Sequence, residues 1–208
     1  MNRIASPRLV PGLAALAAAA TIAATPAVQS SEWNVDPAHT EINFKVSHFF
    51  TPVSGTFQDF DVDLVYDAEN VANSSVNVRI DVASVDTKNP DRDEHLKSAD
   101  FFEAANHPQI TFRSRSVRRT GPDQLMASGP LTIKGVTQEI ELPIRLLGMQ
   151  EIPGEMQEML GGVKRVAGFH AETQIRRQDF GVGVGSWAAT MVVGGNVDIE
   201  IALEANQL

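Results

Sequence analysis

The sequence predicts an all-β fold of about eight antiparallel strands, for three reasons. Apolar and polar residues alternate in one run after another, as in strands with one face toward a core and one toward water. Turn-forming residues such as Gly, Pro, Asn and Asp separate these runs at short intervals. A helical pattern is clear in only one short stretch. This combination is typical of a sandwich or an antiparallel barrel, and alternation alone does not choose between them.

The N-terminus has the features of an export signal. Two arginines precede an apolar, alanine-rich run at residues 13–24, and small residues end the run at Ala27. The run is too short to span a bilayer. We therefore expect a signal peptide over 1–27 and one domain over 28–208, in the bacterial periplasm or secreted. An uncleaved anchor or a disordered tail is the alternative.

The charge and the lack of cysteine exclude several classes of function. The formal net charge is −9, and loss of Arg3 and Arg8, the only charged residues of the leader, would make it −11. So acidic a domain is a poor partner for nucleic acid and is repelled by anionic lipid surfaces. The chain has no cysteine, which excludes thiol redox chemistry, cysteine nucleophiles and zinc ribbons. Its stability must come from the core alone.

The most regular run is Glu41–His48. Ile42, Phe44 and Val46 share one face of the predicted strand, and the polar residues between them share the other. His48 falls on the apolar face, so we expect an imidazole at the edge of an apolar interior.

The same alternation predicts the remaining strands. They lie at residues 32–36, 60–66, 76–82, 110–113, 125–133, 140–146, 169–175 and 197–203, with a less regular strand at 187–193. Turns are expected at 51–55 and 121–123, and a bulge or sheet edge at Gly129-Pro130. Gly148–Val166 lacks a strand pattern and is interpreted as a short helix or a mobile flap.

The segment Pro90–Ala105 interrupts the strands. Its residues 91–97 begin with acids and end with a base, as a short helix prefers. Phe101 and Phe102 cannot both face one side of a strand, so we expect them in a plug or loop packed on the barrel.

Seven stretches together resemble the YceI-like, polyisoprenoid-binding proteins. They are Asp36–Thr40 (DPAHT), Phe44–His48 (FKVSH), Gly55–Phe57 (GTF), Asp93–Phe102 (DEHLKSADFF), His107–Phe112 (HPQITF), Gly129–Thr137 (GPLTIKGVT) and Arg177–Gly181 (RQDFG). The resemblance covers roughly residues 33–203. It implies a lipocalin-like, eight-stranded antiparallel barrel with a short helix, which holds a long isoprenoid or similar lipid without catalysis and without a cofactor. Thr40 replaces the usual Ser, and the 148–166 connection is longer than usual.

The inward rows and the resemblance together give a candidate ligand site, since an eight-stranded barrel has room for one ligand. The apolar wall is expected from Phe44, Val46, Val78, Ile80, Phe112, Ile133, Leu142, Phe169 and Ile175, with His48 and Arg177 as polar contacts.

Both polar contacts have a second interpretation. His48 is either a donor to a ligand head group or a core histidine bonded to backbone. Arg177 is either a clamp for phosphate or the partner of Asp179 or of an acid in 91–100, and we favour the ion pair.

Catalysis and metal binding find little support in the sequence. Asp93, His95 and Asp100 could serve acid–base chemistry, but charges at a helix start explain them more simply. The chain has no nucleophile elbow and no metal-ligand spacing among its histidines. We therefore predict a non-enzymatic carrier of a polyprenyl phosphate or quinone-like lipid that contacts membranes transiently and has no nucleic-acid partner. The alternatives are a periplasmic hydrolase of lipid-like substrates and a stress-related structural protein with a filled barrel. The oligomeric state stays open.

Overall fold

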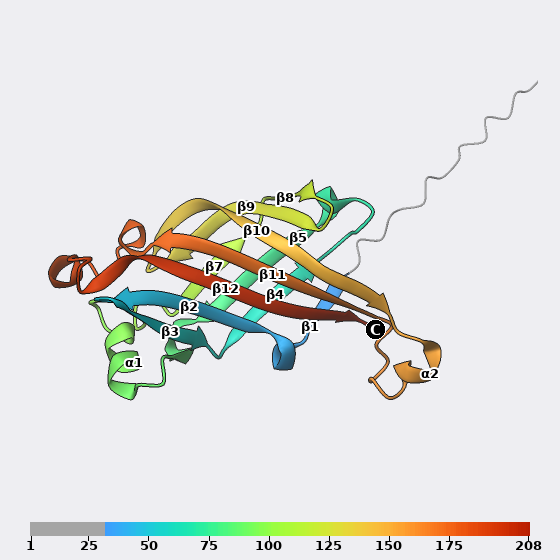
Figure 1. Cartoon of the computed structure of the whole chain (residues 1–208), viewed down its shortest axis with the longest axis horizontal. Coiled ribbons are helices and arrows are strands. Elements are labelled where there is room, and N and C mark those ends of the chain that lie inside the picture. Colours follow the sequence, from blue (N-terminus) through green and yellow to red (C-terminus); the bar gives the residue numbers. More distant parts are fainter. Residues whose placement is uncertain (1–31) are drawn as a thin grey trace, which may run out of the picture.

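The strands form a single sheet that closes on itself (Figure 1). The computed structural model describes residues 32–208, so the predicted signal peptide lies outside the described residues. The strands are β1 Glu32–Val35, β2 Glu41–His48, β3 Thr51–Phe57, β4 Phe60–Val65, β5 Ser75–Asp81, β6 Val85–Asp86, β7 Gln109–Arg113, β8 Ser116–Gly121, β9 Gln124–Ile133, β10 Val136–Glu151, β11 Arg165–Arg176 and β12 Val193–Gln207. The helices are α1 Pro90–Lys97 and α2 Gly154–Gln157. The short 3-10 helices are η1 Pro37–His39, η2 Val71–Asn73, η3 Val82–Ser84, η4 Arg177–Phe180 and η5 Gly185–Trp187.

The pairing confirms an eight-stranded antiparallel barrel. Neighbouring strands follow the order β1-β4-β5-β7-β9-β10-β11-β12, and β12 pairs with β1 to close the ring. Several strands of the barrel are bent and split into two pieces. β1 and β2 both pair with β12, and β7 and β8 both pair with β9. β3 pairs with β2. The inward parity changes at each bend, for example from Phe112 in β7 to Val117 in β8, so each bent strand gives two separate alternating runs in the sequence.

Local hydrogen bonds produce the bends. In η1, between β1 and β2, the Asp36 carboxylate accepts a bond of 2.9 Å from the Ala38 N–H. In η3, between β5 and β6, Asp81 does the same for Ala83 at 2.8 Å. The bulge expected at Gly129-Pro130 is wrong, because β9 keeps one register with β10 throughout. The irregularity lies opposite, between β7 and β8, where the Arg113 carbonyl fills the space that a side chain at Gly129 would need.

Two predicted loops are strands. Residues 51–55 belong to β3, and the turn before them is formed by Phe49 and Phe50. The 148–166 connection is strand only at its two ends, since β10 extends to Glu151 and β11 begins at Arg165, and the short helix expected within it is α2. This end of the hairpin projects past the barrel, so neither face is buried and no alternation is needed there.

One predicted strand is a loop. Trp187 ends η5, residues 188–192 lie outside the sheet, and β12 begins at Val193. The indole of Trp187 packs on Phe101 at 5.7 Å between ring centroids, which places this segment over the end of the barrel.

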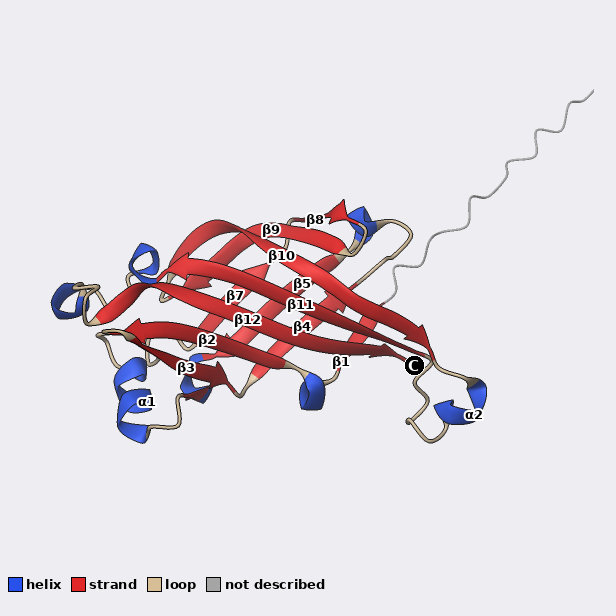
Figure 2. Ribbon diagram, in the orientation of Figure 1, coloured by secondary structure: helices blue, strands red, loops and turns tan. Residues whose placement is uncertain are grey.

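The two ends of the barrel are closed differently. At one end Trp33 donates a hydrogen bond of 3.0 Å to the Tyr66 carbonyl, and the Tyr66 ring meets Phe169 edge-on at 5.2 Å. At the other end lie the predicted helix α1 and the Phe101-Phe102 segment (Figure 2). Phe101 is buried, as expected for a plug on the barrel. No helix in residues 32–208 has the length and apolar character needed to cross a membrane.

Candidate functional site

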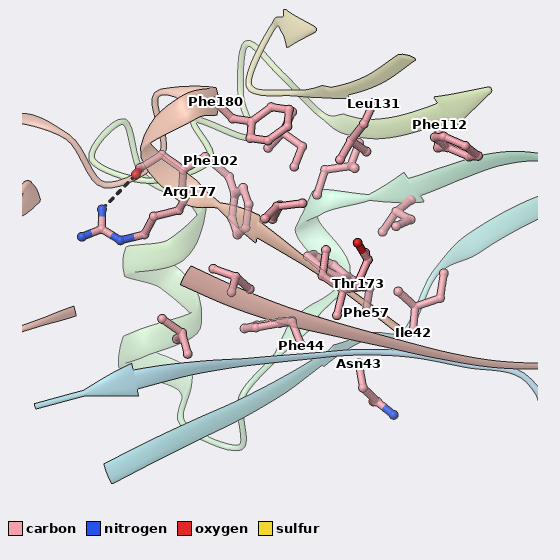
Figure 3. A pocket seen from close by; sticks show the side chains of 18 of the residues that line it. Ile42, Asn43, Phe44, Phe57, Phe102, Phe112, Leu131, Thr173, Arg177 and Phe180 are labelled. Atoms are coloured by element: carbon pink, nitrogen blue, oxygen red, sulfur yellow. Dashed lines mark hydrogen bonds between the residues drawn. The ribbon is translucent and has the colours of Figure 1, made fainter. Parts of the chain in front are cut away.

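An apolar cavity of about 160 Å³ lies inside the barrel toward the α1 end. We call it the main cavity. Its wall includes the rings of Phe44, Phe57 and Phe102, which pack in sequence at 5.5 and 6.1 Å between centroids. Figure 3 shows these rings and Ile42, Leu131 and Phe112 gathered around one space. This wall offers a ligand dispersion contacts and very few polar partners.

A second cavity of about 60 Å³, the inner cavity, lies toward Tyr66 and Phe169. Four aliphatic side chains line both cavities: Ile42, Val78, Leu142 and Ile201. They therefore form the constriction between the two cavities. The barrel interior thus holds two apolar cavities and is not a solid core.

The predicted wall residues all face this interior. Those on the main cavity are Phe44, Val46, Val78, Ile80, Phe112, Ile133, Leu142 and Ile175. Phe169 lies on the inner cavity instead. Strand parity places them there, since a closed barrel gives every inward row the same interior. Contact between these side chains and a ligand stays a prediction.

Arg177 lies on the wall of the main cavity, as predicted, but its hydrogen bonds match neither expected interpretation. Its guanidinium points away from the cavity in Figure 3, and the residue as a whole is only 4% exposed. It donates to five backbone carbonyls: Gly194 at 2.9 Å, Val182 at 3.0 Å, Trp187 at 2.8 Å, Val193 at 2.9 Å, and Gly183. These bonds use all five of its N–H groups, so none is left for a phosphate, and no ion pair joins it to Asp179 or the 91–100 acids in the described chain.

The carbonyl cage explains how this charge can be buried. Burial lowers the pKa of Arg177, and the carbonyl dipoles compensate the guanidinium in place of a carboxylate. The residue holds the 182–194 loop in position over the end of the cavity.

His48 is also displaced from its expected position. It is exposed at the end of β2, lies edge-on against the Phe49 ring at 4.9 Å, and lines neither cavity. His48 is the last residue of β2 before the turn, and its side chain is exposed although its partner Val193 lines the main cavity. The prediction of an inward imidazole is wrong, and a contact with a ligand head group stays a prediction.

Thr173 is a polar wall residue that the candidate list omitted. It lies on β11 between Ala171 and Ile175, and its side chain faces the main cavity (Figure 3). Its hydroxyl has no hydrogen-bond partner among residues 32–208. A lone hydroxyl in an otherwise apolar inward row was the signal that could have identified it.

The match to a family model decides the relationship of this chain to known proteins. The model for the YceI-like domain matches residues 33–205. The chain belongs to the YceI-like family.

Individual YceI relatives agree with this assignment. Protein YceI of Escherichia coli O157:H7 is 39% identical over 170 residues, which are 81% of this chain and 82% of the relative. The structure of Burkholderia cenocepacia BcnA has a TM-score of 0.72 at 26% identity, covering 82% of this chain and 99% of BcnA. A polyisoprenoid binding domain from Saccharophagus degradans has a TM-score of 0.62 at 14% identity over 85% of this chain and 98% of that domain, and shows a shared fold.

The carboxylate–histidine set of this YceI-like chain has structural contacts. His95 Nε2 lies 3.2 Å from Asp100 Oδ2, and the Trp187 indole N–H donates to the same oxygen at 3.2 Å. These two partners lower the pKa of Asp100. Asp93 accepts bonds from the backbone and side chain of Thr87. These contacts connect α1 to the loops around the cavity end.

Two groups of side chains on the outer face could offer atoms to a metal. One is Asp36, His39 and Glu204, and the other is His170, Glu172 and Glu200. In each group the histidine already pairs with a carboxylate, at 2.9 Å in the first and 3.2 Å in the second. Neither group lies on the wall of the main or inner cavity.

Proposed function

We propose that this YceI-like protein binds a long isoprenoid lipid noncovalently inside its barrel and stores or transfers it without catalysis. The observation that carries the proposal is the pair of apolar cavities inside the barrel, the main cavity and the inner cavity, which meet at four shared side chains. The Saccharophagus degradans neighbour is described as a polyisoprenoid binding domain, which supports the same class of ligand. A polyprenyl phosphate and a quinone-like lipid are the candidates.

The cavity volume says how such a ligand must enter. At 160 Å³ the main cavity is close to an engineered cavity of about 150 Å³ that holds one benzene. A tail of about 40 carbons, whose burial from water would nominally yield ~30 kcal/mol, needs several times that space. Entry therefore requires the wall to move, and the rings of Phe44 and Phe102 are only half-buried, so we expect them to move first.

The energetics favour transfer over permanent capture. A lipid that starts in a membrane is already out of water, so the hydrophobic gain on entering the barrel largely cancels. Contacts of the head group and the entropy of the tail then decide the direction. Such a near-balanced exchange allows the protein both to load and to unload.

The polar groups indicate where the head group lies. A phosphate inside the main cavity would be a buried charge without a partner, because Arg177 has no free N–H. A neutral quinone carbonyl could instead accept a hydrogen bond from Thr173. We therefore expect a quinone-like head inside the cavity, and a polyprenyl phosphate with its phosphate outside.

We also propose that the chain is exported. The support is the basic, alanine-rich start of the sequence, with Ala27 as the predicted cleavage site. Edman sequencing or mass spectrometry of the protein from its own periplasm tests this. A mass equal to the full 208-residue chain would contradict it.

Native mass spectrometry of protein purified from its own source tests the binding proposal. We expect an added mass that solvent extraction releases and that fragments as an isoprenoid. Protein delipidated by unfolding and refolding should take up the same lipid from solution. A protein that carries no isoprenoid and takes none up would refute the proposal, and hydrolysis of lipid esters by the same preparation would favour the hydrolase alternative.

A further inference from the structure

The β2–β3 hairpin ends in two exposed aromatic side chains. Phe49 is 51% exposed and Phe50 is 100% exposed. The Phe49 N–H donates a bond of 2.9 Å to the Val192 carbonyl, which brings the hairpin beside Met191, itself 76% exposed. We call Phe49, Phe50 and Met191 the apolar tip. It lies at the end of the barrel opposite the C-terminus and α2 (Figure 1).

The backbone of this turn is unfavourable for the residues it holds. Phe49 has φ 51°, in the left-handed region that Gly and Asn adopt and bulky residues avoid. Two-residue hairpin turns accordingly favour Asn-Gly or Asp-Gly. Phe50 gains no packing in exchange, because it is fully exposed. Residues that break a local rule without a structural gain indicate a function.

The charge distribution sets the apolar tip apart from the rest of the molecule. The chain has 26 acidic residues, but none falls in 42–58 or in 180–197, the two segments that form the tip and its surroundings. The opposite end also exposes apolar side chains, including Met159 at 73%. There, however, Glu155 and Glu158 flank them. The two segments of the apolar tip therefore bring no negative charge of their own to a membrane surface, and the acids at this end of the barrel, such as those of α1 and the residues after it, belong to other segments.

The apolar tip is also adjacent to the main cavity. His48, the residue before the turn, pairs with Val193, and Val193 lines that cavity. Val46, two residues earlier on β2, lines it as well. A surface that docks through the apolar tip therefore meets the barrel at the end where the larger cavity lies.

We propose that Phe49, Phe50 and Met191 insert into the interfacial layer of a lipid bilayer and hold the barrel with its main cavity toward the membrane. Aromatic side chains favour this layer, and contiguous exposed apolar groups mark interaction sites. Three side chains give weak, reversible docking, as a carrier needs. The role in lipid loading rests on the proposed function, whereas docking itself needs no ligand in the barrel.

Co-sedimentation of the mature chain with phosphatidylethanolamine–phosphatidylcholine vesicles tests the proposal. We expect Phe50→Ser to weaken partitioning about tenfold, since one phenylalanine side chain is lost from the apolar contact. Phe49→Asn should also weaken binding while raising thermal stability, because Asn suits the left-handed backbone. That opposite change separates a docking role from damage to the fold.

Met159→Ser is the matched control, because Met159 is 73% exposed, close to the 76% of Met191, and lies at the acidic end. We expect it to bind vesicles like the wild type. Adding phosphatidylglycerol should weaken binding of the wild type, and salt should restore it, since screening removes the repulsion. Binding driven by surface charge would show the reverse.

Three results would overturn the proposal. They are unchanged vesicle binding by Phe50→Ser, equal loss with Met159→Ser, and a concentration-dependent dimer, abolished by Phe50→Ser, in a protein that ignores vesicles. Uptake of lipid from detergent solution, without vesicles, distinguishes a failure of membrane docking from a failure of the proposed lipid binding. If Phe50→Ser takes up lipid from detergent normally but does not bind vesicles, both proposals stand. If the wild type binds vesicles but takes up no lipid, only the proposed function fails.

Discussion

Enlarging Val78 tests whether the barrel is a tunnel or a filled core. Val78 lines both cavities at the constriction, so Val78→Phe directs a ring into that space. The change adds about four carbons, nominally worth ~3 kcal/mol if they fill empty apolar volume. Overpacking a filled core would instead cost about 1–3 kcal/mol.

We therefore expect the delipidated Val78→Phe protein to be between neutral and about 3 kcal/mol more stable than wild type. For a domain of this size that is a rise in Tm of up to roughly 10 °C, followed by circular dichroism. Lipid uptake should be lost in the same protein, because the ring blocks the passage between the cavities.

Val82→Phe is the control, since Val82 is 1% exposed and lines neither cavity. It should lower stability by about 1–3 kcal/mol. If Val78→Phe is destabilised like the control and still takes up lipid, the space at the constriction is not part of the binding site and our reasoning is wrong.

Three further predictions concern the polar groups around the cavity. Arg177→Lys should lower the free energy of unfolding, measured by urea denaturation, by about 2–4 kcal/mol, because three N–H donors cannot satisfy five buried carbonyls. If Arg177 were instead a phosphate clamp, the variant would lose affinity for the lipid and keep its stability. Thr173→Val should leave stability nearly unchanged and weaken binding of a quinone about 2- to 10-fold, with no effect on a hydrocarbon tail that lacks the carbonyl, as measured by titration calorimetry. The pKa of Asp100 lies below its ordinary value of 3.8, because His95 and Trp187 donate to its carboxylate. Because this pKa is depressed in the folded state, the ionised carboxylate stabilises the fold fully above pH 3.8. That stabilisation is lost as the pH falls through the folded-state pKa, so the Trp187 contact should loosen only below pH 3.8. Tryptophan fluorescence should report that step, and Asp100→Asn should abolish it; a midpoint above 3.8 would contradict the assignment.

Strand parity made most of the interior predictable. Phe44, Val78 and Phe112 belong to three strands, yet each was placed inward by the period of two alone, and each lines the main cavity. Parity fails where a strand leaves the barrel. His48 keeps the inward parity of β2 but is exposed at the end of the strand, while its cross-strand partner Val193 lines the main cavity.

The errors in loops and polar contacts have other physical causes. Turn composition favoured residues 51–55, whereas the actual turn uses Phe49 and Phe50 against their backbone preference. Arg177 was expected to need a carboxylate because burying a charge requires compensation. Its partners are backbone carbonyls, which every residue carries and which no sequence pattern can reveal.

The seam of the barrel lies between the first and last parts of the chain. Asn34 and Val35 of β1 pair with Asn206 and Ala205 of β12, and most of β2 also pairs with β12. A nascent polypeptide delivers its N-terminus first, so β1 and β2 cannot form their hydrogen bonds to β12 until the fifteen residues of that strand have been made. Until then the sheet is open and has two edge strands with unpaired backbone N–H and C=O groups. Folds that depend on such long-range strand pairing form slowly. Truncating the last few residues should therefore yield an adhesive, aggregation-prone intermediate in place of a slightly shortened barrel.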